Sequence, residues 1–238
     1  PISYTDSLGR VWRPGNYDGK FKGQITIRQA LTESRNVPTI KIASLVGVQN
    51  VLVTARRFGL AGPMEPYLPL AIGACEATPL EMASAFTVFP NLGIQYKPYF
   101  IRKVEDYDGV KKEEHFPQAR KVLEPETAQN MLGLLENVVQ SGTAVAAKSL
   151  GRPLGGKTGT TNDFTDAWFV GFSPSLTVAV WVGFDTKVTL GDRETGAAVA
   201  LPIWMQFMDQ VLKSKPIEQF PAAVTTEQLG TANHAHRA

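Results

Sequence analysis

Apolar residues recur at helical spacing in the first half of the chain, which predicts a helical region. The segments with this spacing are 26–33, 37–47, 49–58 and 79–89. Thr26 is placed to cap the first helix, and Thr78, Pro79 and Glu81 have the spacing of a capping box with proline at the first helical position. Residues 1–23 are rich in Gly, Pro, Asn and Asp and predict irregular structure instead.

The second half changes from a hairpin to a helix and then to strands. Around 97–116 the apolar period is two, and Asp108-Gly109 supplies the turn of a hairpin. Further helices are predicted at 126–140 and 197–212, and strands at 154–160, 166–173 and 176–185. The links between these strands are too short for a crossover, so the sheet must be antiparallel. The order predicts an α+β fold, in which a helical part packs on one face of an antiparallel sheet and a cleft lies between them.

One domain is expected over residues 1–215. Residues 216–238 are polar and aperiodic, which predicts a disordered C-terminal tail. The chain has 238 residues, 43% hydrophobic and 19% charged, which is ordinary for a globular protein. No stretch approaches the roughly 20 apolar residues of a membrane helix, and the N-terminus does not have the pattern of a signal peptide.

Charge and metal-ligand chemistry exclude several function classes. A net charge of +2, with Lys and Arg scattered, gives no indication of a nucleic-acid partner. The single cysteine, Cys75, excludes an internal disulfide and a cysteine-ligated zinc site. His115, His234 and His236 do not form a pattern typical of a metal site or a catalytic triad. We therefore expect no metal and no cofactor.

Two short motifs carry candidate chemistry. Ser34-Arg35-Asn36 lies between two predicted helices, where Pro38 disfavours helix in the preceding residues and predicts a turn. Lys157-Thr158-Gly159-Thr160 lies on a predicted strand after two further glycines, a pattern that often marks the close approach of a ligand. Each motif alone has a simpler explanation, as turn chemistry or as a strand bulge. Their order and their separation of about 120 residues make them informative together.

Ser-x-Asn-type and Lys-Thr-Gly motifs belong to the signature of penicillin-binding proteins and class A β-lactamases. Three longer segments, 12–43, 70–93 and 155–185, resemble the transpeptidase domain of class A, bifunctional penicillin-binding proteins. The resemblance covers roughly residues 1–212. It implies the penicillin-binding fold, incomplete at its N-terminus, and serine acyl transfer from a D-Ala-D-Ala stem peptide to the amine of a neighbouring strand. β-Lactam antibiotics would be mimics of that substrate, trapped as acyl-enzymes.

The resemblance also implies roles for the strand motif. Lys157, Thr158 and Thr160 would bind the terminal carboxylate of the stem peptide through one strand edge. The backbone N–H of Thr160 would donate to the oxyanion. Gly159 would let the substrate backbone pair alongside the strand.

The resemblance also implies roles for the turn motif, but this sequence departs from the family in one respect. Ser34 would belong to the proton path to the leaving amine, while Asn36 would hold the substrate amide and orient a catalytic lysine. However, no serine in the sequence has lysine three residues later, so the family's Ser-x-x-Lys nucleophile is absent. In the family it lies shortly upstream, so we expect this chain to be truncated and inert towards acylation.

Three functional interpretations remain open. The first is an enzyme fragment, with a glycosyltransferase and a membrane anchor upstream, and therefore an extracytoplasmic location. The second is a serine β-lactamase, against which stands Arg35, at a position where aspartate is usual. The third is a non-catalytic module that binds β-lactams or stem peptide.

Overall fold

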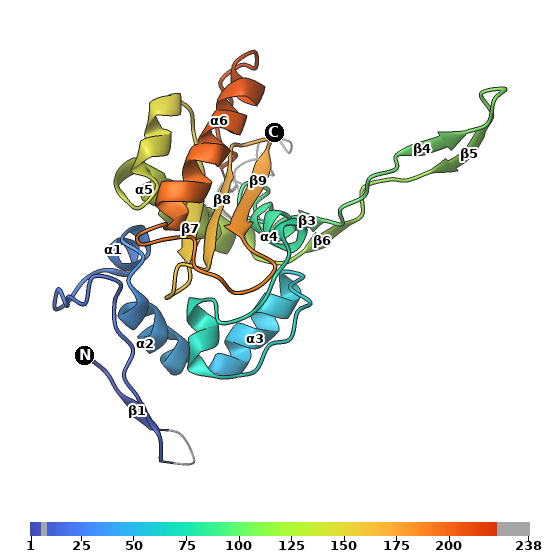
Figure 1. Cartoon of the computed structure of the whole chain (residues 1–238). Coiled ribbons are helices and arrows are strands. Elements are labelled where there is room, and N and C mark those ends of the chain that lie inside the picture. Colours follow the sequence, from blue (N-terminus) through green and yellow to red (C-terminus); the bar gives the residue numbers. More distant parts are fainter. Residues whose placement is uncertain (6–8, 223–238) are drawn as a thin grey trace, which may run out of the picture.

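The computed structural model describes residues 1–5 and 9–222. At its centre is a three-stranded antiparallel sheet with the order β7-β8-β9 (Figure 1). Its strands are β7 (Gly155–Thr160), β8 (Asp166–Phe172) and β9 (Thr177–Gly183). They match the predicted strands to within two residues at each end, and the antiparallel pairing is confirmed.

Helices cover the sheet on both faces. The helices are α1 (Ile27–Thr32), α2 (Asn36–Val46), α3 (Val48–Arg57), α4 (Pro79–Phe86), α5 (Pro125–Ser141) and α6 (Leu201–Leu212). Shorter helical turns are η1 (Leu68–Ile72), η2 (Val145–Leu150) and the π-helical η3 (Gly196–Ala200). The helix α6 crosses one face, and α4 lies behind the sheet in Figure 1. The α+β prediction is confirmed.

Alternation along β8 places apolar side chains on both faces of the sheet. On the α6 side, Phe169 is fully buried and meets Trp204 edge-on, with ring centroids 5.0 Å apart. On the opposite side, Phe172 is fully buried and lies 6.5 Å from the ring of Phe89. A one-residue slip would move Phe169 and Phe172 to the opposite faces and away from Trp204 and Phe89, so the packing specifies the register of the sheet.

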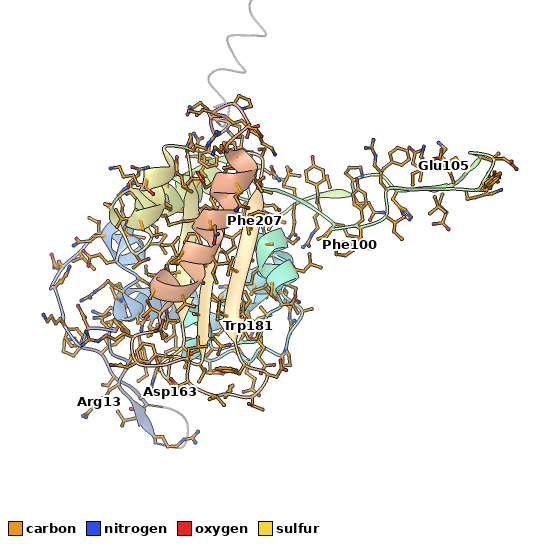
Figure 2. The ribbon with its side chains drawn as sticks, turned by 45° about the horizontal axis from the view of Figure 1, so that its top comes forward. Arg13, Phe100, Glu105, Asp163, Trp181 and Phe207 are labelled. Carbon is orange, nitrogen blue, oxygen red and sulfur yellow. The ribbon has the colours of Figure 1, made fainter. Side chains whose placement is uncertain are left out.

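The predicted hairpin forms a long arm that projects from the body (Figures 1 and 2). Its two short sheets pair β3 (Ile94–Tyr96) with β6 (Ala119–Lys121), and β4 (Lys103–Glu105) with β5 (Lys111–Glu114). Gly109 has a φ of 77°, and the Asp106 carboxylate accepts hydrogen bonds from the backbone N–H groups of Asp108 and Val110. The Asp108-Gly109 turn is therefore confirmed.

The predicted turn at residues 34–36 is shorter than expected. Asn36 is already the first residue of α2, and Pro38 lies within the first helical turn. Proline is tolerated there because the first N–H groups of a helix have no intrahelical acceptor. The N–H of Val37, another of these groups, donates instead to the Oδ1 of Asn16 at 3.2 Å.

The first residues of the predicted tail, 216–222, lie within the described part of the structure. Phe220 packs edge-on against Phe172, with ring centroids 5.7 Å apart. The guanidinium of Arg152 donates to the Pro216 carbonyl at 3.0 Å and also to carbonyls at the end of α6. These contacts hold 216–222 against the domain, and the rest of the predicted tail lies outside the described residues.

Within the described ranges, no individual helix has the length and apolar composition of a membrane span. Helices α2 and α3 reach that composition only as a pair, with a bend of 97° between them. The same ranges contain no group of three His, Cys, Asp or Glu side chains that could hold a metal ion. His234 and His236 lie outside them.

Candidate active site

The two motifs meet in the folded chain. The Nζ of Lys157 donates a hydrogen bond of 2.6 Å to the Oγ of Ser34, and another of 3.0 Å to the Thr158 carbonyl. Ser34 has a φ of 54°, a left-handed conformation that few residues with a side chain adopt. Its N–H donates to the Leu31 carbonyl, which closes α1. The turn between α1 and α2 thus presents the Ser34 hydroxyl to β7.

Burial of the ammonium lowers the pKa of Lys157 from 10.5 to about 8. The two acceptors of Lys157, a hydroxyl and a carbonyl, are both neutral and do not offset the desolvation of the charge. The ammonium is still mostly protonated near pH 7, but it can release its proton at a small free-energy cost. A group with this property, hydrogen-bonded to a hydroxyl, suits a proton path.

The backbone of β7 has an open edge, because β7 is the outer strand of its sheet. The N–H of Thr161 donates to the Asp166 carbonyl, so this pair is hydrogen-bonded and the next pair, Thr160 with Ala167, is not. The N–H of Thr160 therefore points away from β8, towards the open edge. This direction suits the predicted oxyanion donor.

The hydroxyls of the two motif threonines are held by neighbouring segments. The Oγ1 of Thr158 lies 2.8 Å from the Oγ1 of Thr143, which follows α5. The Oγ1 of Thr160 accepts a hydrogen bond of 3.0 Å from the N–H of Gly196, at the start of η3. A Cβ on Gly196 would collide with the Gly159 and Trp168 carbonyls, so the close approach requires glycine. Both hydroxyls therefore have defined positions.

The glycines of the strand have a structural explanation. A Cβ on Gly155 would lie 2.7 Å from the ring of Phe172, and one on Gly156 would lie 2.7 Å from the ring of Phe169. Packing against β8 thus accounts for these two glycines without a ligand. At Gly159 a Cβ would lie 3.1 Å from the Cβ of Trp168, which is tight but less severe.

Asn36 lies two positions after Ser34, and its side chain bonds to the N-terminal loop and not to Lys157 or Ser34. Its Nδ2 donates to the Gly15 carbonyl at 3.3 Å, and the residue is partly buried. The side chain therefore borders the N-terminal loop, on the same turn as Ser34. Its predicted roles towards the substrate amide and a catalytic lysine stay predictions.

Arg35 has a structural role that the sequence reading missed. Its side chain is 8% exposed and donates to the Asp18 carboxylate at 2.8 Å and to the Lys20 carbonyl at 2.7 Å. The hydrogen bond from Arg35 lowers the pKa of Asp18. Arg35 thereby fixes the N-terminal loop against the turn that holds Ser34. The only signal in the sequence was a charged residue in the middle of a short motif whose other residues are polar and uncharged.

Thr143 and Gly196 were also missed, because each lies outside the motif it contacts and in a different structural element. Thr143 is 15 positions from Thr158, and Gly196 is 36 positions from Thr160. No local pattern in the sequence connects these residues to the strand motif.

Comparison with known proteins identifies the family of the chain. The model of the penicillin-binding protein transpeptidase domain matches residues 3–209. Penicillin-binding protein 1A of Aquifex aeolicus (strain VF5) is 44% identical over 217 residues, which are 91% of this chain and 30% of that protein. Penicillin-binding protein 1A of Neisseria lactamica is 41% identical over 215 residues, covering 87% of this chain and 27% of that protein. The chain thus spans less than a third of the length of these relatives.

Solved structures give the same assignment. The crystal structure of penicillin-binding protein 1A from Haemophilus influenzae superposes with a TM-score of 0.87 at 29% identity, covering 93% of this chain and 39% of that one. The penicillin-binding protein PonA1 from Mycobacterium tuberculosis gives 0.81 at 25% identity, with 94% and 65% covered. The family match over nearly the whole chain, together with the joined Ser-x-Asn and Lys-Thr-Gly motifs, shows that this chain belongs to the penicillin-binding protein transpeptidase domain family.

Proposed function

We propose that the chain is the C-terminal part of a peptidoglycan D,D-transpeptidase domain of the class A type. The observation that carries the proposal is the hydrogen bond between Lys157 and Ser34, which assembles the two family motifs into one site. The nucleophile itself is not encoded here, because no serine has lysine three residues later. It would come from sequence outside these 238 residues.

The proposed reaction is acyl transfer in two steps. The serine oxygen attacks the carbonyl between the two D-Ala residues, the C–N bond breaks, and the terminal D-Ala leaves with a proton on its amine. The acyl group then passes to the amine of a neighbouring stem peptide. Ser34 is suited to deliver the proton to the leaving amine, and Lys157 to supply or hold that proton, because the two are directly hydrogen-bonded.

Substrate binding would use the open edge of β7. The substrate backbone would pair alongside Gly159 as an added strand, with the N–H of Thr160 directed at the oxyanion. The terminal carboxylate would lie near the Lys157 ammonium and the hydroxyls of Thr158 and Thr160. Asn36 would contact the substrate amide from the opposite side of the site.

β-Lactams and stem peptides are the proposed partners. PonA1, which shares this fold at 25% identity, has been solved in complex with penicillin V. Because peptidoglycan is cross-linked outside the cytoplasmic membrane, the domain would act there. A membrane anchor and a glycosyltransferase would lie in sequence outside these residues. Neither the fold nor the comparisons favour the β-lactamase or the binding-module interpretation.

The proposal is tested by intact mass after incubation with excess benzylpenicillin. The chain is compared with a form extended upstream to include a Ser-x-x-Lys segment. We expect only the extended form to gain the mass of one penicillin and to keep it for hours. Rapid loss of the adduct would favour a β-lactamase, and no adduct on the extended form would contradict the acyl-transfer proposal.

A further inference from the structure

The segment that follows α5 touches both halves of the site. Gly142 is packed so closely on Thr32, the last residue of α1, that a Cβ there would collide with the Thr32 carbonyl. The N–H of the next residue, Thr143, donates to the same carbonyl at 3.3 Å. The segment is therefore anchored on the helix that leads into the Ser34 turn.

The side chain of Thr143 reaches in the other direction, to β7. Its Oγ1 lies 2.8 Å from the Oγ1 of Thr158, and either hydroxyl could donate. The following residue, Ala144, is fully buried, and its N–H donates to the Val138 carbonyl at 3.2 Å. The backbone of Thr143 is thus fixed on both sides, so its hydroxyl meets Thr158 from a rigid support.

The direction of this hydrogen bond decides what Thr158 can do. A hydroxyl has one hydrogen to donate. If Thr158 donates to Thr143, it has none left for a carboxylate. If Thr143 donates to Thr158, the Thr158 hydrogen is free, and the incoming hydrogen bond polarises its hydroxyl as a donor. An anion beside Thr158 selects the second arrangement.

We propose that Thr143 is a positioning residue that holds the Thr158 hydroxyl as a donor to the terminal carboxylate of the acyl donor. The inference deepens the proposed function and rests on it. Thr143 does not touch the carboxylate and acts only through Thr158. It also links the carboxylate end of the site to α1, because the same residue bonds to Thr32 and to Thr158.

The test uses the form extended upstream to include the nucleophile. Thr143→Val removes the hydroxyl at nearly constant volume, and Thr143→Ser keeps it. The probes are benzylpenicillin, which carries a carboxylate, and its methyl ester, which carries none. The second-order rate of acylation is measured by intact mass for each, with thermal unfolding to show that the variants are folded.

We expect Thr143→Val to lower the rate with benzylpenicillin by about 3- to 10-fold, the size of one hydrogen bond between neutral groups. The rate of Thr143→Val with the ester should stay within about twofold of the parent rate. Thr143→Ser should keep most of the parent rate with benzylpenicillin, because it keeps the hydroxyl. In a Thr158→Val background, adding Thr143→Val should cost nothing more, because its target is gone.

The inference is overturned if Thr143→Val leaves the rate with benzylpenicillin unchanged. It is also overturned if both probes slow equally, or if the loss persists in the Thr158→Val background, since either result means a structural role alone. Failure of the proposed function looks different, because the parent protein itself would then not be acylated.

Discussion

The Nζ of Lys157 and the Oγ of Ser34 lie 2.6 Å apart, although 123 positions separate the two residues. The contact joins an edge strand to the turn between two helices. Among the described residues, the ammonium has a hydroxyl and a carbonyl as its acceptors, and burial lowers the pKa of Lys157 to about 8. The stability of the domain should therefore depend on pH in a way that can be assigned to this residue.

Lys157→Met should change the pH dependence of stability between pH 7.5 and 10.5. Below about pH 8 the lysine is charged in both states, and folding bears the full cost of burying that charge. Above it, the unfolded chain still binds the proton and the folded chain does not, so the parent gains stability as pH rises. The gain should approach about 3 kcal/mol, and the variant should lack it.

Urea unfolding of parent and variant, measured in half-unit steps of pH, isolates the effect of Lys157. All other lysines and tyrosines contribute equally to both proteins and cancel in the difference. A difference in unfolding free energy that stays constant from pH 7.5 to 10.5 would contradict the lowered pKa.

Two glycines of the same helical segment should respond oppositely to alanine. Gly142→Ala drives a methyl group into the Thr32 carbonyl and should cost about 1–3 kcal/mol of unfolding free energy. Gly133→Ala, within α5, meets nothing within 4 Å and should stabilise by about 0.5–1 kcal/mol. Denaturant titration gives both values. Equal effects of the two substitutions would show that the contact of Gly142 with α1 does not constrain the fold.

Arg35→Ala should destabilise the protein and loosen the loop in front of Ser34. The substitution removes hydrogen bonds from a charged group to the Asp18 carboxylate and the Lys20 carbonyl. The unfolding free energy should therefore decrease by about 1.5–3 kcal/mol. Arg28→Ala is the matched control, because Arg28 is an exposed residue of α1. Its removal should change the unfolding free energy by no more than about 0.5 kcal/mol. Thermal unfolding of both variants provides the comparison, and equal melting temperatures would refute the role of Arg35.

Thr32→Val should not destabilise the domain, although the residue is buried. The Oγ1 of Thr32 is buried and has no hydrogen-bond partner within residues 1–5 and 9–222, so it bears a desolvation cost without compensation. An apolar side chain of the same shape should leave stability unchanged or raise it by about 1 kcal/mol. A loss above about 1 kcal/mol, measured by urea titration, would mean that the hydroxyl is solvated or bonded in solution.

The strand order, the helices and the hairpin could be predicted because their signals are local. Thr26 and Thr78 cap their helices as expected, with side chains that accept from the N–H groups of Gln29 and Glu81. The start of α2 was predicted less accurately, because proline is compatible both with a turn before a helix and with the first turn of a helix. The structure places Pro38 in the second situation.

The site could be predicted only as far as its motifs extend. Ser34 and Lys157 were recognisable as a pair of signatures, but their direct hydrogen bond depends on how the helical part docks on β7. Two contacts support the site, Arg35 with Asp18 and Thr143 with Thr158. Each joins segments that no hydrophobic period or motif spacing in the sequence connects. Packing also explains Gly155 and Gly156, which the sequence reading connected with ligand approach.

The most direct test of the account is the rate of acylation by benzylpenicillin in the extended form and in Ser34→Ala, Lys157→Met and the double variant. If the two side chains form one proton path, each single change should slow acylation by about 100-fold or more, and the double variant should be no slower than the worse single one. If the two losses multiply, or if either variant reacts as fast as the parent, Ser34 and Lys157 do not act as one unit.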